Sequence, residues 1–253
     1  MTAIFKREFL SYFRSPVGYV AISLFSFLSG FIFYSQYATG AVNIGSEVIS
    51  LRSFFVVIVP IITMGLLSED KKRGTDILYY TTPVSLFNVV VGKVLAAFAL
   101  YAIMFVNVII HIFVTLGCGG VFEVGAIGTI IVFFFMAFMF ISIGLFASAI
   151  TDSQIISAIV SFIFILIAQI MSTIANYAGA FVNSILSAMN IKSAASVGDA
   201  ITKAIAWFDP FVKTQDFRIG VFSVSALVYL VSVGVVFLYL TFRVLEKKRW
   251  SQA

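Results

Sequence analysis

The stretch SEDKKRGTDILYYTTPVSLFNVVVGK, residues 68–93, interrupts an otherwise apolar chain. The 16 Lys and Arg and 11 Asp and Glu make 27 charged residues, and six of them lie between Glu69 and Asp76. Aliphatic and aromatic residues dominate the sequence on both sides. The charged stretch therefore marks a point where the chain leaves an apolar environment and meets water.

The composition indicates an integral membrane protein. Hydrophobic residues make up 61% of the chain and charged residues 11%, whereas a soluble domain carries about 25% charged residues because its surface faces water. The 253 residues would suffice for one or two soluble domains by length, but too few of them are polar to coat even one. The single cysteine, Cys118, excludes an internal disulfide and a cysteine-rich metal site.

Six stretches are apolar and long enough to cross a bilayer as helices, which takes about 20 residues. They cover residues 17–37, 48–68, 94–116, 125–150, 154–175 and 219–242. The second is the weakest, because it contains Arg52, whose side chain is expected to reach the interface, and Pro60, which predicts a kink. We therefore expect an all-α integral membrane protein with six transmembrane helices in a single domain, residues 1–253.

The distribution of basic residues predicts the orientation of the bundle. With both termini inside, 11 of the 16 Lys and Arg fall in cytoplasmic segments, and such an excess is typical of the cytoplasmic side. We therefore expect a multi-pass protein with its N-terminus and C-terminus inside. The net charge of +5 is then largely a topology signal and does not indicate a nucleic-acid partner.

Two segments outside the spans are expected to be helical. Residues 1–16 predict an amphipathic helix in the interface plane, the alternative being an ordinary basic flank of the first span. Its apolar face carries Phe5, Phe9, Tyr12 and Phe13, and its polar face Arg7, Ser11 and Arg14. The longest connection, residues 176–218, is expected outside the cell, with short helices near 178–190 and 197–207. The first of these is apolar enough to dip into the membrane or to pack on the mouth of the bundle.

Ionisable residues are scarce inside the expected spans. His111 is the one placed well inside, with Asn107 one turn earlier on the same face and Gln169 in the fifth span. These three side chains are candidates for contacts with neighbouring helices or with a substrate in the pathway. Intramembrane carboxylates, which usually mark proton or sodium coupling, are not expected, so the sequence argues against a transporter powered by an ion gradient.

The chain lacks the motif of a nucleotide-binding loop, GxxxxGK[ST]. Its Gly92-Lys93 pair has no upstream glycine and is followed by Val94. The Ser-Gly pair in FLSG, residues 27–30, likewise lacks the earlier glycine that an intramembrane serine protease would need. We therefore expect no enzymatic activity and no cofactor on this chain, and any energy must come from a partner.

The residues after Ser68 predict a short helix, a turn and a return to the membrane. Gly74 is expected to end the first helix, and Thr75 to cap a second helix with Asp76 at its positive end. The body of this second helix is Ile77, Leu78, Tyr79 and Tyr80. Pro83 is expected to stop it, and Ser85 to cap the helix that enters the third span.

A short surface helix with apolar and aromatic residues beside charges is typical of a docking surface. The alternative is a solvated loop in which Lys71, Lys72 and Arg73 only fix the topology. The residue order favours docking, because it resembles the segment after the second span in permeases of the ABC-2 type. The shared features are Glu69, Gly74-Thr75-Asp76, Leu78, Pro83-Val84-Ser85 and Gly92-Lys93.

The chain departs from that pattern at two points. Arg73 directly precedes Gly74, and Asp76 stands where glutamate is commoner. The basic amphipathic start, the six spans and the long outer segment extend the resemblance over nearly the whole chain. The C-terminal part is similar to the gliding-motility-associated subgroup and also to the sodium- and copper-related branches.

The resemblance implies the permease subunit of an ATP-driven exporter in the cytoplasmic (inner) membrane of a prokaryote. It implies two separate ABC ATPase subunits, which bind ATP and Mg, and a second permease copy, identical or related. Under this resemblance residues 1–16 are an interfacial elbow, 69–85 hold the coupling-helix loop, and 176–218 cap the outer exit as a re-entrant segment. Spans 2 and 5 would face the second permease and the pathway.

The resemblance also assigns roles within the charged stretch. The coupling helix that receives the ATPase would be Gly74, Thr75, Asp76, Ile77, Leu78, Tyr79 and Tyr80. The hinge to the second span would be Glu69, Asp70, Lys71, Lys72 and Arg73, and the entry to the third span Pro83, Ser85, Gly92 and Lys93. The alternative function is a membrane scaffold or accessory subunit without a transport path. An apolar pathway suits lipids, amphipathic peptides and hydrophobic drugs equally, and the short loops leave room for an auxiliary membrane subunit with an extracellular domain.

Overall fold

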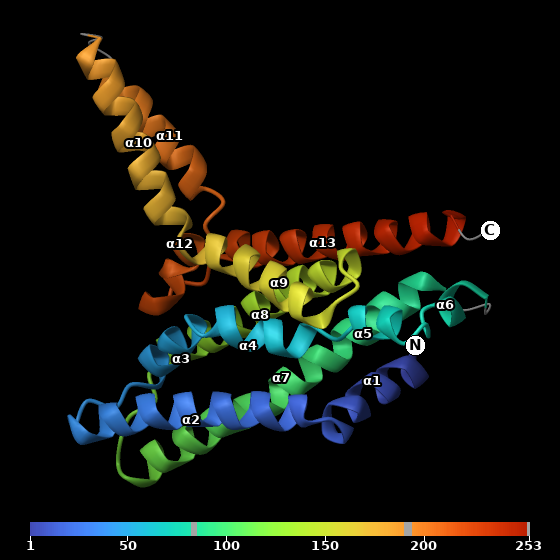
Figure 1. Cartoon of the computed structure of the whole chain (residues 1–253). Coiled ribbons are helices and arrows are strands. Elements are labelled where there is room, and N and C mark those ends of the chain that lie inside the picture. The colour runs from blue at the N-terminus through green and yellow to red at the C-terminus, as the bar shows by residue number, and fades with distance from the viewer. Residues whose placement is uncertain (82–84, 190–193, 252–253) are drawn as a thin grey trace.

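The computed structural model describes residues 1–81, 85–189 and 194–251, and every regular element in these ranges is helical (Figure 1). Both termini lie at the same end of an elongated helical bundle, which we call the terminal end; the opposite end is the far end (Figure 1). The elements are α1 (Thr2–Arg14), α2 (Pro16–Ala38), α3 (Ile44–Arg52), α4 (Phe55–Thr63), α5 (Ser68–Lys72), α6 (Ile77–Thr81), α7 (Leu86–Gly117), α8 (Val124–Ile150), α9 (Gln154–Gln169), α10 (Met171–Ala188), α11 (Ala194–Ala206), α12 (Pro210–Lys213), a 3₁₀ turn η1 (Gln215–Ile219) and α13 (Val224–Ser251).

Four helices are long and apolar enough to cross a membrane by themselves: α2, α7, α8 and α13. Two bent helix pairs meet the same criterion together, which raises the number of spans in the described residues to six if each pair is one span. The helix α8 is central, because it contacts α3, α4, α7, α9 and α13. The predicted all-α membrane architecture is confirmed, and the six predicted spans agree with the count in which each bent pair is one span.

Aromatic rings fill the core between α2, α4, α7 and α8. Phe55 of α4 lies 5.1 Å from Phe133 and 5.5 Å from Phe140 of α8, measured between ring centroids. Tyr101 of α7 lies 5.3 Å from Phe133, and all four side chains are buried. Aromatic pairs at such distances add favourable edge and face contacts to the packing, which holds these helices together without charged residues.

The second span is broken in the middle. Helix α3 and the segment Phe55–Lys72, which contains α4 and α5, meet at an angle of 61°, and the break falls at Ser53 and Phe54. Pro60 lies inside α4, away from this break, and the predicted kink at Pro60 stays a prediction. The predicted escape of the Arg52 side chain to the interface is wrong, since this side chain is buried in the bundle.

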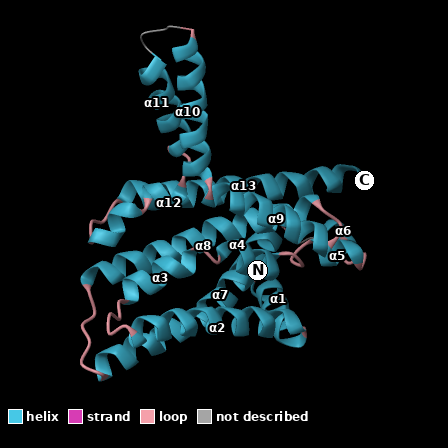
Figure 2. Cartoon of the chain, turned by 60° about the vertical axis from the view of Figure 1, so that its left-hand side comes forward, coloured by secondary structure: helices cyan, strands magenta, loops and turns pink. Residues whose placement is uncertain are grey.

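The fifth span is broken too, and its second half leaves the bundle. Helix α9 ends at Gln169, where the chain bends by 60° into α10. Helices α10 and α11 pack against each other as a hairpin that projects sideways from the bundle (Figures 1 and 2). The outer segment is therefore helical as predicted, but its first helix neither starts at residue 178 nor packs on the mouth of the bundle.

The glycines of the hairpin allow its two helices to approach closely. A methyl group at Gly179 would overlap the Thr202 hydroxyl and come within 2.8 Å of the carbonyl oxygen of Gly198. The Thr202 hydroxyl lies 3.0 Å from that carbonyl oxygen and 3.3 Å from the one of Ala175. Small residues at the crossing thus replace bulky apolar packing, as in closely packed membrane helix pairs.

The amphipathic N-terminal helix is present as predicted. In α1, Tyr12 is buried and Phe5, Phe9 and Phe13 pack against the core, while the polar residues Arg7, Ser11 and Arg14 are exposed. Pro16 is the first residue of α2, a position where its missing N–H costs nothing. The helix also buries Glu8, which the apolar pattern does not predict.

Candidate functional site

Five polar side chains meet at the terminal end of the bundle, and we call them the charged cluster: Arg7, Glu8, Asp70, Tyr79 and Lys93. They come from α1, α5, α6 and α7. The Lys93 ammonium is 0% exposed and lies 2.6 Å from Asp70 Oδ2 and 3.0 Å from Glu8 Oε1. A buried ammonium needs such carboxylate partners, so Lys93 joins α1 to α5 beneath the start of the third span.

Arg7 and Tyr79 complete the charged cluster from its solvent side. Arg7 Nη2 donates to Glu8 Oε1 at 2.6 Å and to the Tyr79 hydroxyl at 2.7 Å, and the Tyr79 hydroxyl donates to Asp70 Oδ2. Burial raises the pKa of the Tyr79 phenol; Lys93 and Arg7 oppose this rise, and Asp70 adds to it. The phenol therefore stays protonated and bridges α6 to Asp70.

The packing of α1 against α7 explains why a glycine stands directly before Lys93. A side chain at Gly92 would lie within 3.1 Å of Ile4 Cγ2 and 3.5 Å of the Met1 carbonyl oxygen. The glycine therefore lets α1 lie directly against α7, which places Glu8 within reach of the neighbouring Lys93. The predicted passage of both residues into the third-span helix is confirmed, since α7 runs from Leu86 to Gly117.

The helix α6 has an inward side and an outward side. Asp76 and Tyr79 are buried, whereas Ile77 and Leu78 are 52% and 54% exposed. Asp76 Oδ2 lies 3.6 Å from the ammonium of Lys248 at the end of α13. The expectation of an exposed aromatic surface is thus wrong for Tyr79, and the exposed apolar side chains among those that the structure describes in α6 are the aliphatic Ile77 and Leu78.

Two predicted roles in this loop, the caps at Thr75 and Ser85, differ from the structure. The Thr75 hydroxyl lies 3.1 Å from Asp70 Oδ1 and 3.2 Å from the Asp70 carbonyl oxygen, so it links α6 back to α5. Ser85 occupies the N-cap position of α7 but makes no side-chain capping bond. Gly74 has a φ of 68°, which favours glycine and agrees with the predicted turn. Pro83 and the side chain of Tyr80 lie outside the described residues.

The hinge predicted at residues 69–73 is helical, and the break in the chain precedes it. Residues 69–72 belong to α5, where Glu69 pairs with Arg73, and Lys71 lies 3.5 Å from Asp152. The α-helix is interrupted at residues 64–67, between α4 and α5. Main-chain groups freed at such a break must find other partners in an apolar environment.

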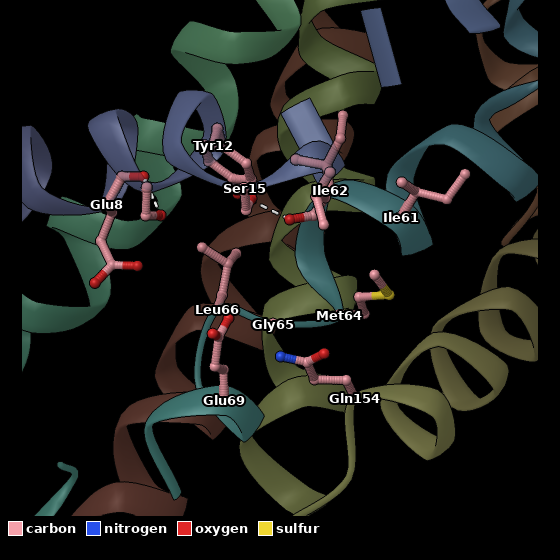
Figure 3. Close-up of a pocket in the computed structure, with 12 residues that line it drawn as sticks. Glu8, Tyr12, Ser15, Ile61, Ile62, Met64, Gly65, Leu66, Glu69 and Gln154 are labelled. Atoms are coloured by element: carbon pink, nitrogen blue, oxygen red, sulfur yellow. Dashed lines mark hydrogen bonds between the residues drawn. The ribbon is translucent and has the colours of Figure 1, made fainter. Parts of the chain in front are cut away.

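Side chains from three other helices supply those partners. The Tyr12 hydroxyl of α1 donates to the Ile62 carbonyl oxygen at 2.8 Å, beside a cavity lined by α1, α4, α5 and α9 residues (Figure 3). The Ser148 hydroxyl of α8 accepts from the main-chain N–H groups of Leu67 and Ser68 at 2.9 and 3.0 Å. Lys93 donates to the carbonyl oxygen of Leu66. The break is therefore stabilised by side chains from the N-terminal helix α1 and from two spans, α7 and α8.

The two bends of the broken spans are in contact with each other. Gln169 Nε2, at the end of α9, donates to the carbonyl oxygen of Ser53 at 2.9 Å and lies 3.4 Å from that of Arg52. Gln169 is therefore an interhelical contact, one of its two predicted roles. Arg52 Nη1 in turn donates to the Thr214 hydroxyl at 3.2 Å, just beyond α12.

A single carboxylate, that of Asp209, caps the N-terminal ends of two helices beside this junction. Asp209 Oδ1 accepts from the main-chain N–H groups of Phe211 and Val212 at 2.7 and 3.2 Å, at the start of α12. Its Oδ2 accepts from the main-chain N–H of Ser172 at 3.0 Å, at the start of α10. Asp209 thus satisfies free N–H groups of both helices and attaches the projecting hairpin to the bundle.

A buried carboxylate contradicts the expectation that the spans lack one. Glu47 of α3 is 0% exposed, and its Oε1 lies 2.7 Å from both Ser29 Oγ and His111 Nδ1. The argument against ion-coupled chemistry from missing carboxylates therefore fails. His111 contacts neighbouring helices as predicted, whereas the Asn107 amide nitrogen is buried without a hydrogen-bond partner in the described residues.

The arrangement of Ser29, His111 and Glu47 is not that of a catalytic triad. The serine hydroxyl and the carboxylate both approach the same ring nitrogen, Nδ1, at 3.5 and 2.7 Å. A triad needs the serine and the acid on opposite ring nitrogens, so that the ring can pass a proton between them. The predicted second span, residues 48–68, begins directly after Glu47 and therefore leaves it out. Asn43 caps α3 by accepting from Ser46 N at 2.9 Å, and an asparagine at this position is the sequence signal for an earlier helix start.

Nearly the whole chain matches a model of a protein family. A family model described as ABC-2 family transporter protein matches residues 2–250, while no curated protein matches the chain. The assignment to a gliding-motility-associated subgroup stays a prediction. Because the match covers nearly the entire bundle, including α6 and both broken spans, the chain belongs to the ABC-2 family of transporter proteins and is a multi-pass membrane component of an ABC transporter.

Proposed function

We propose that the chain is the permease subunit of an ATP-driven exporter and that two ABC ATPase subunits dock on α6. The single observation that carries this proposal is the two-sided character of α6. Ile77 and Leu78 face outward, while Asp76 and Tyr79 are tied to α13 and to the charged cluster. An exposed aliphatic surface that is firmly attached to several spans can receive a partner and pass on its movement.

The remaining parts of the proposal follow from family membership. ATP and Mg are bound by the ATPase subunits, and this chain supplies the substrate path together with a second permease copy, identical or related. The terminal end lies in the cytoplasm of a prokaryotic cell, in agreement with the excess of basic residues there, and the far end lies outside. Residues 1–253 form one transmembrane domain, to which an auxiliary membrane subunit with an extracellular domain could attach.

The experiment is reconstitution with the ATPase, chosen as a P-loop protein encoded beside this chain. Leu78→Asp places a charge on the outward side of α6, so ATPase binding and ATP-driven transport should fall at least tenfold while thermal stability stays unchanged. Val121→Asp is the matched control, because Val121 is also an exposed aliphatic residue but lies at the far end. Unchanged ATPase binding in Leu78→Asp would refute docking on α6.

The second candidate function is a scaffold or accessory subunit without its own transport path. The buried contacts of α6 would serve that role as well, since they fix a docking helix whatever it does next. The two functions differ in the same assay: a scaffold binds the ATPase but supports no ATP-driven movement of lipid, peptide or drug across the reconstituted membrane.

A further inference from the structure

The C-terminal half of α13 presents an exposed stripe that changes from apolar to basic along the helix. Val236 and Leu240 are 53% and 39% exposed, Arg243 and Lys247 are exposed as well, and Trp250 is 78% exposed. Steps of three or four residues place all five side chains on one side of the helix. Toward the terminal end the stripe therefore runs from aliphatic to basic and then to aromatic side chains.

The length of α13 places this change at the boundary of the hydrocarbon layer. Residues 224–242 carry no charge. At about 1.5 Å per residue these 19 residues span about 28 Å, close to the hydrocarbon thickness of about 30 Å. Arg243 then lies at the boundary, and Lys247, one turn later, lies among the lipid headgroups. Trp250 follows at a depth where tryptophan is enriched in membrane proteins.

A groove lies beside this stripe, between α8 and α13. Its apolar wall contains Phe146 of α8 together with Leu240 and Val244 of α13, and its basic wall contains Arg243 and Lys247. The groove therefore combines an apolar surface with positive charge at the depth where a phospholipid has its acyl chains and its phosphate.

Aromatic packing fixes the apolar wall. The ring of Phe146 lies 5.6 Å from that of Phe237 in α13 and 6.5 Å from that of Phe164 in α9, measured between centroids. Three helices thus determine the position of Phe146. The groove is therefore a property of the folded bundle and not of α13 alone.

Positive charge is in excess beside the groove. Residues 243–250, RVLEKKRW, contain four basic residues and one acidic residue, Glu246. Glu246 also lines the groove, and its Oε2 accepts from Arg243 Nη1 at 2.6 Å. Because a guanidinium has five N–H donors, Arg243 keeps donors for a second anion. Lys248 pairs with a carboxylate of the α6 region, whereas Lys247 is exposed and has no ion-pair partner among the described residues.

We propose that this groove binds an anionic phospholipid. The lipid phosphate lies between Arg243 and Lys247, and one acyl chain lies along the apolar wall. Basic pockets beside transmembrane helices attract anionic headgroups, and the aliphatic and aromatic wall suits the chain. A zwitterionic lipid offers the same phosphate but adds an ammonium group, which the excess of positive charge repels. The bound lipid would steady the end of α13, from which Lys248 reaches α6.

The chain has two tryptophans, which makes the test direct. In Trp207→Phe the remaining tryptophan is Trp250, which lines the groove and whose fluorescence a brominated lipid quenches on contact. The protein is placed in phosphatidylcholine vesicles with increasing fractions of brominated phosphatidylglycerol or brominated phosphatidylcholine. The binding constant of the anionic lipid should exceed that of the zwitterionic lipid at least about fivefold. Equal quenching by the two brominated lipids would overturn the proposal.

Four variants in the Trp207→Phe background locate the site. Arg243→Gln and Lys247→Gln should each lower the ratio of the two binding constants about threefold or more. Arg14→Gln is the matched control, because Arg14 is exposed at the end of α1 and does not line the groove; its ratio should stay unchanged. Arg249→Gln tests a second groove, which Arg249 and Trp250 line together, and should also leave the ratio unchanged.

The remaining outcomes each contradict the proposal. A decrease in Arg249→Gln alone would place the lipid in the second groove, and equal decreases in all four variants would show a general attraction of the basic end without a site. If a second copy of the chain covered the groove, neither brominated lipid would quench Trp250. These measurements use the chain without an ATPase, so their failure is distinguishable from a failure of ATPase docking.

Discussion

The side-chain amide of Gln169 donates to the main-chain carbonyl of Ser53 at 2.9 Å, and this one bond joins the bends of two broken spans. Each bend, 61° in the second span and 60° in the fifth, exposes main-chain groups that a straight helix would satisfy internally. Because the two bends lie against each other, a single polar side chain serves both. A change in the geometry of one bend is therefore expected to alter the geometry of the other.

Gln169→Leu should reveal this connection. The leucine fills a similar volume but leaves the carbonyl oxygen of Ser53 without its partner, at a cost of about 1–3 kcal/mol. The midpoint of thermal unfolding in detergent should fall by several degrees, as scaled for a chain of this size. Gln215→Leu is the control, because Gln215 is exposed in η1; equal midpoints for both variants would contradict the prediction.

Lys93→Met should be among the most destabilising substitutions in the chain. It leaves the buried carboxylate of Glu8 and the partly buried carboxylate of Asp70 without the ammonium that pairs with both, and loss of one partner of a buried ion pair costs about 3–5 kcal/mol. Lys72→Met, at an exposed position, should be neutral. Adding Glu8→Gln and Asp70→Asn to Lys93→Met should restore part of the lost stability; a further, additive loss would show that the three residues do not act together.

Gly179→Ala should open the α10–α11 hairpin. The added methyl group would overlap the Thr202 hydroxyl and press on the Gly198 carbonyl oxygen, so the helices must separate, at a cost of about 1–3 kcal/mol. Spin labels at Ser187 and Asp199, in a Cys118→Ser background, should report a longer and broader distance distribution. Gly30→Ala meets nothing within 4 Å and should leave this distribution unchanged.

The stability contributed by Tyr79 should depend on pH in one direction. The pKa of the phenol is raised in the folded protein, so its contribution is fully present below the unfolded value of about 10 and is lost as the pH rises through the folded value. Tyr79→Phe should therefore lower the unfolding midpoint at pH 7, and the difference from the unmodified protein should shrink above pH 10. A difference that grows at alkaline pH would show that the phenol does not donate to Asp70.

The sequence predicts the positions of the spans better than it predicts the side-chain contacts that stabilise their breaks. Apolar length identifies all six, and helical periodicity identifies the buried face of α1, because both depend on local composition. The breaks at residues 53–54 and 64–67 depend on side chains far away in the chain, such as Gln169, Tyr12 and Ser148. No local pattern shows which main-chain groups such residues will satisfy.

In the charged stretch, too, the local sequence predicts the secondary structure but not the partners of the charged side chains. Its composition and order predict a loop, a turn at Gly74 and a short helix, and all three are present. The partners of its charges come from elsewhere: Asp70 pairs with Lys93 and Asp76 with Lys248. Residues 69–76 by themselves thus resemble a solvated surface, although Asp76 is buried and Asp70 is partly buried.

The attachments of α6 have a mechanical consequence. Tyr79 and Asp70 connect this short helix to α1 and α7, and Asp76 connects it to the end of α13. Because these contacts join α6 to its neighbours, a push on its aliphatic side would move α1 and the ends of the third and sixth spans, α7 and α13, together. Because α7 and α13 are long helices, a small displacement of their ends beside α6 would become a larger displacement at the far end.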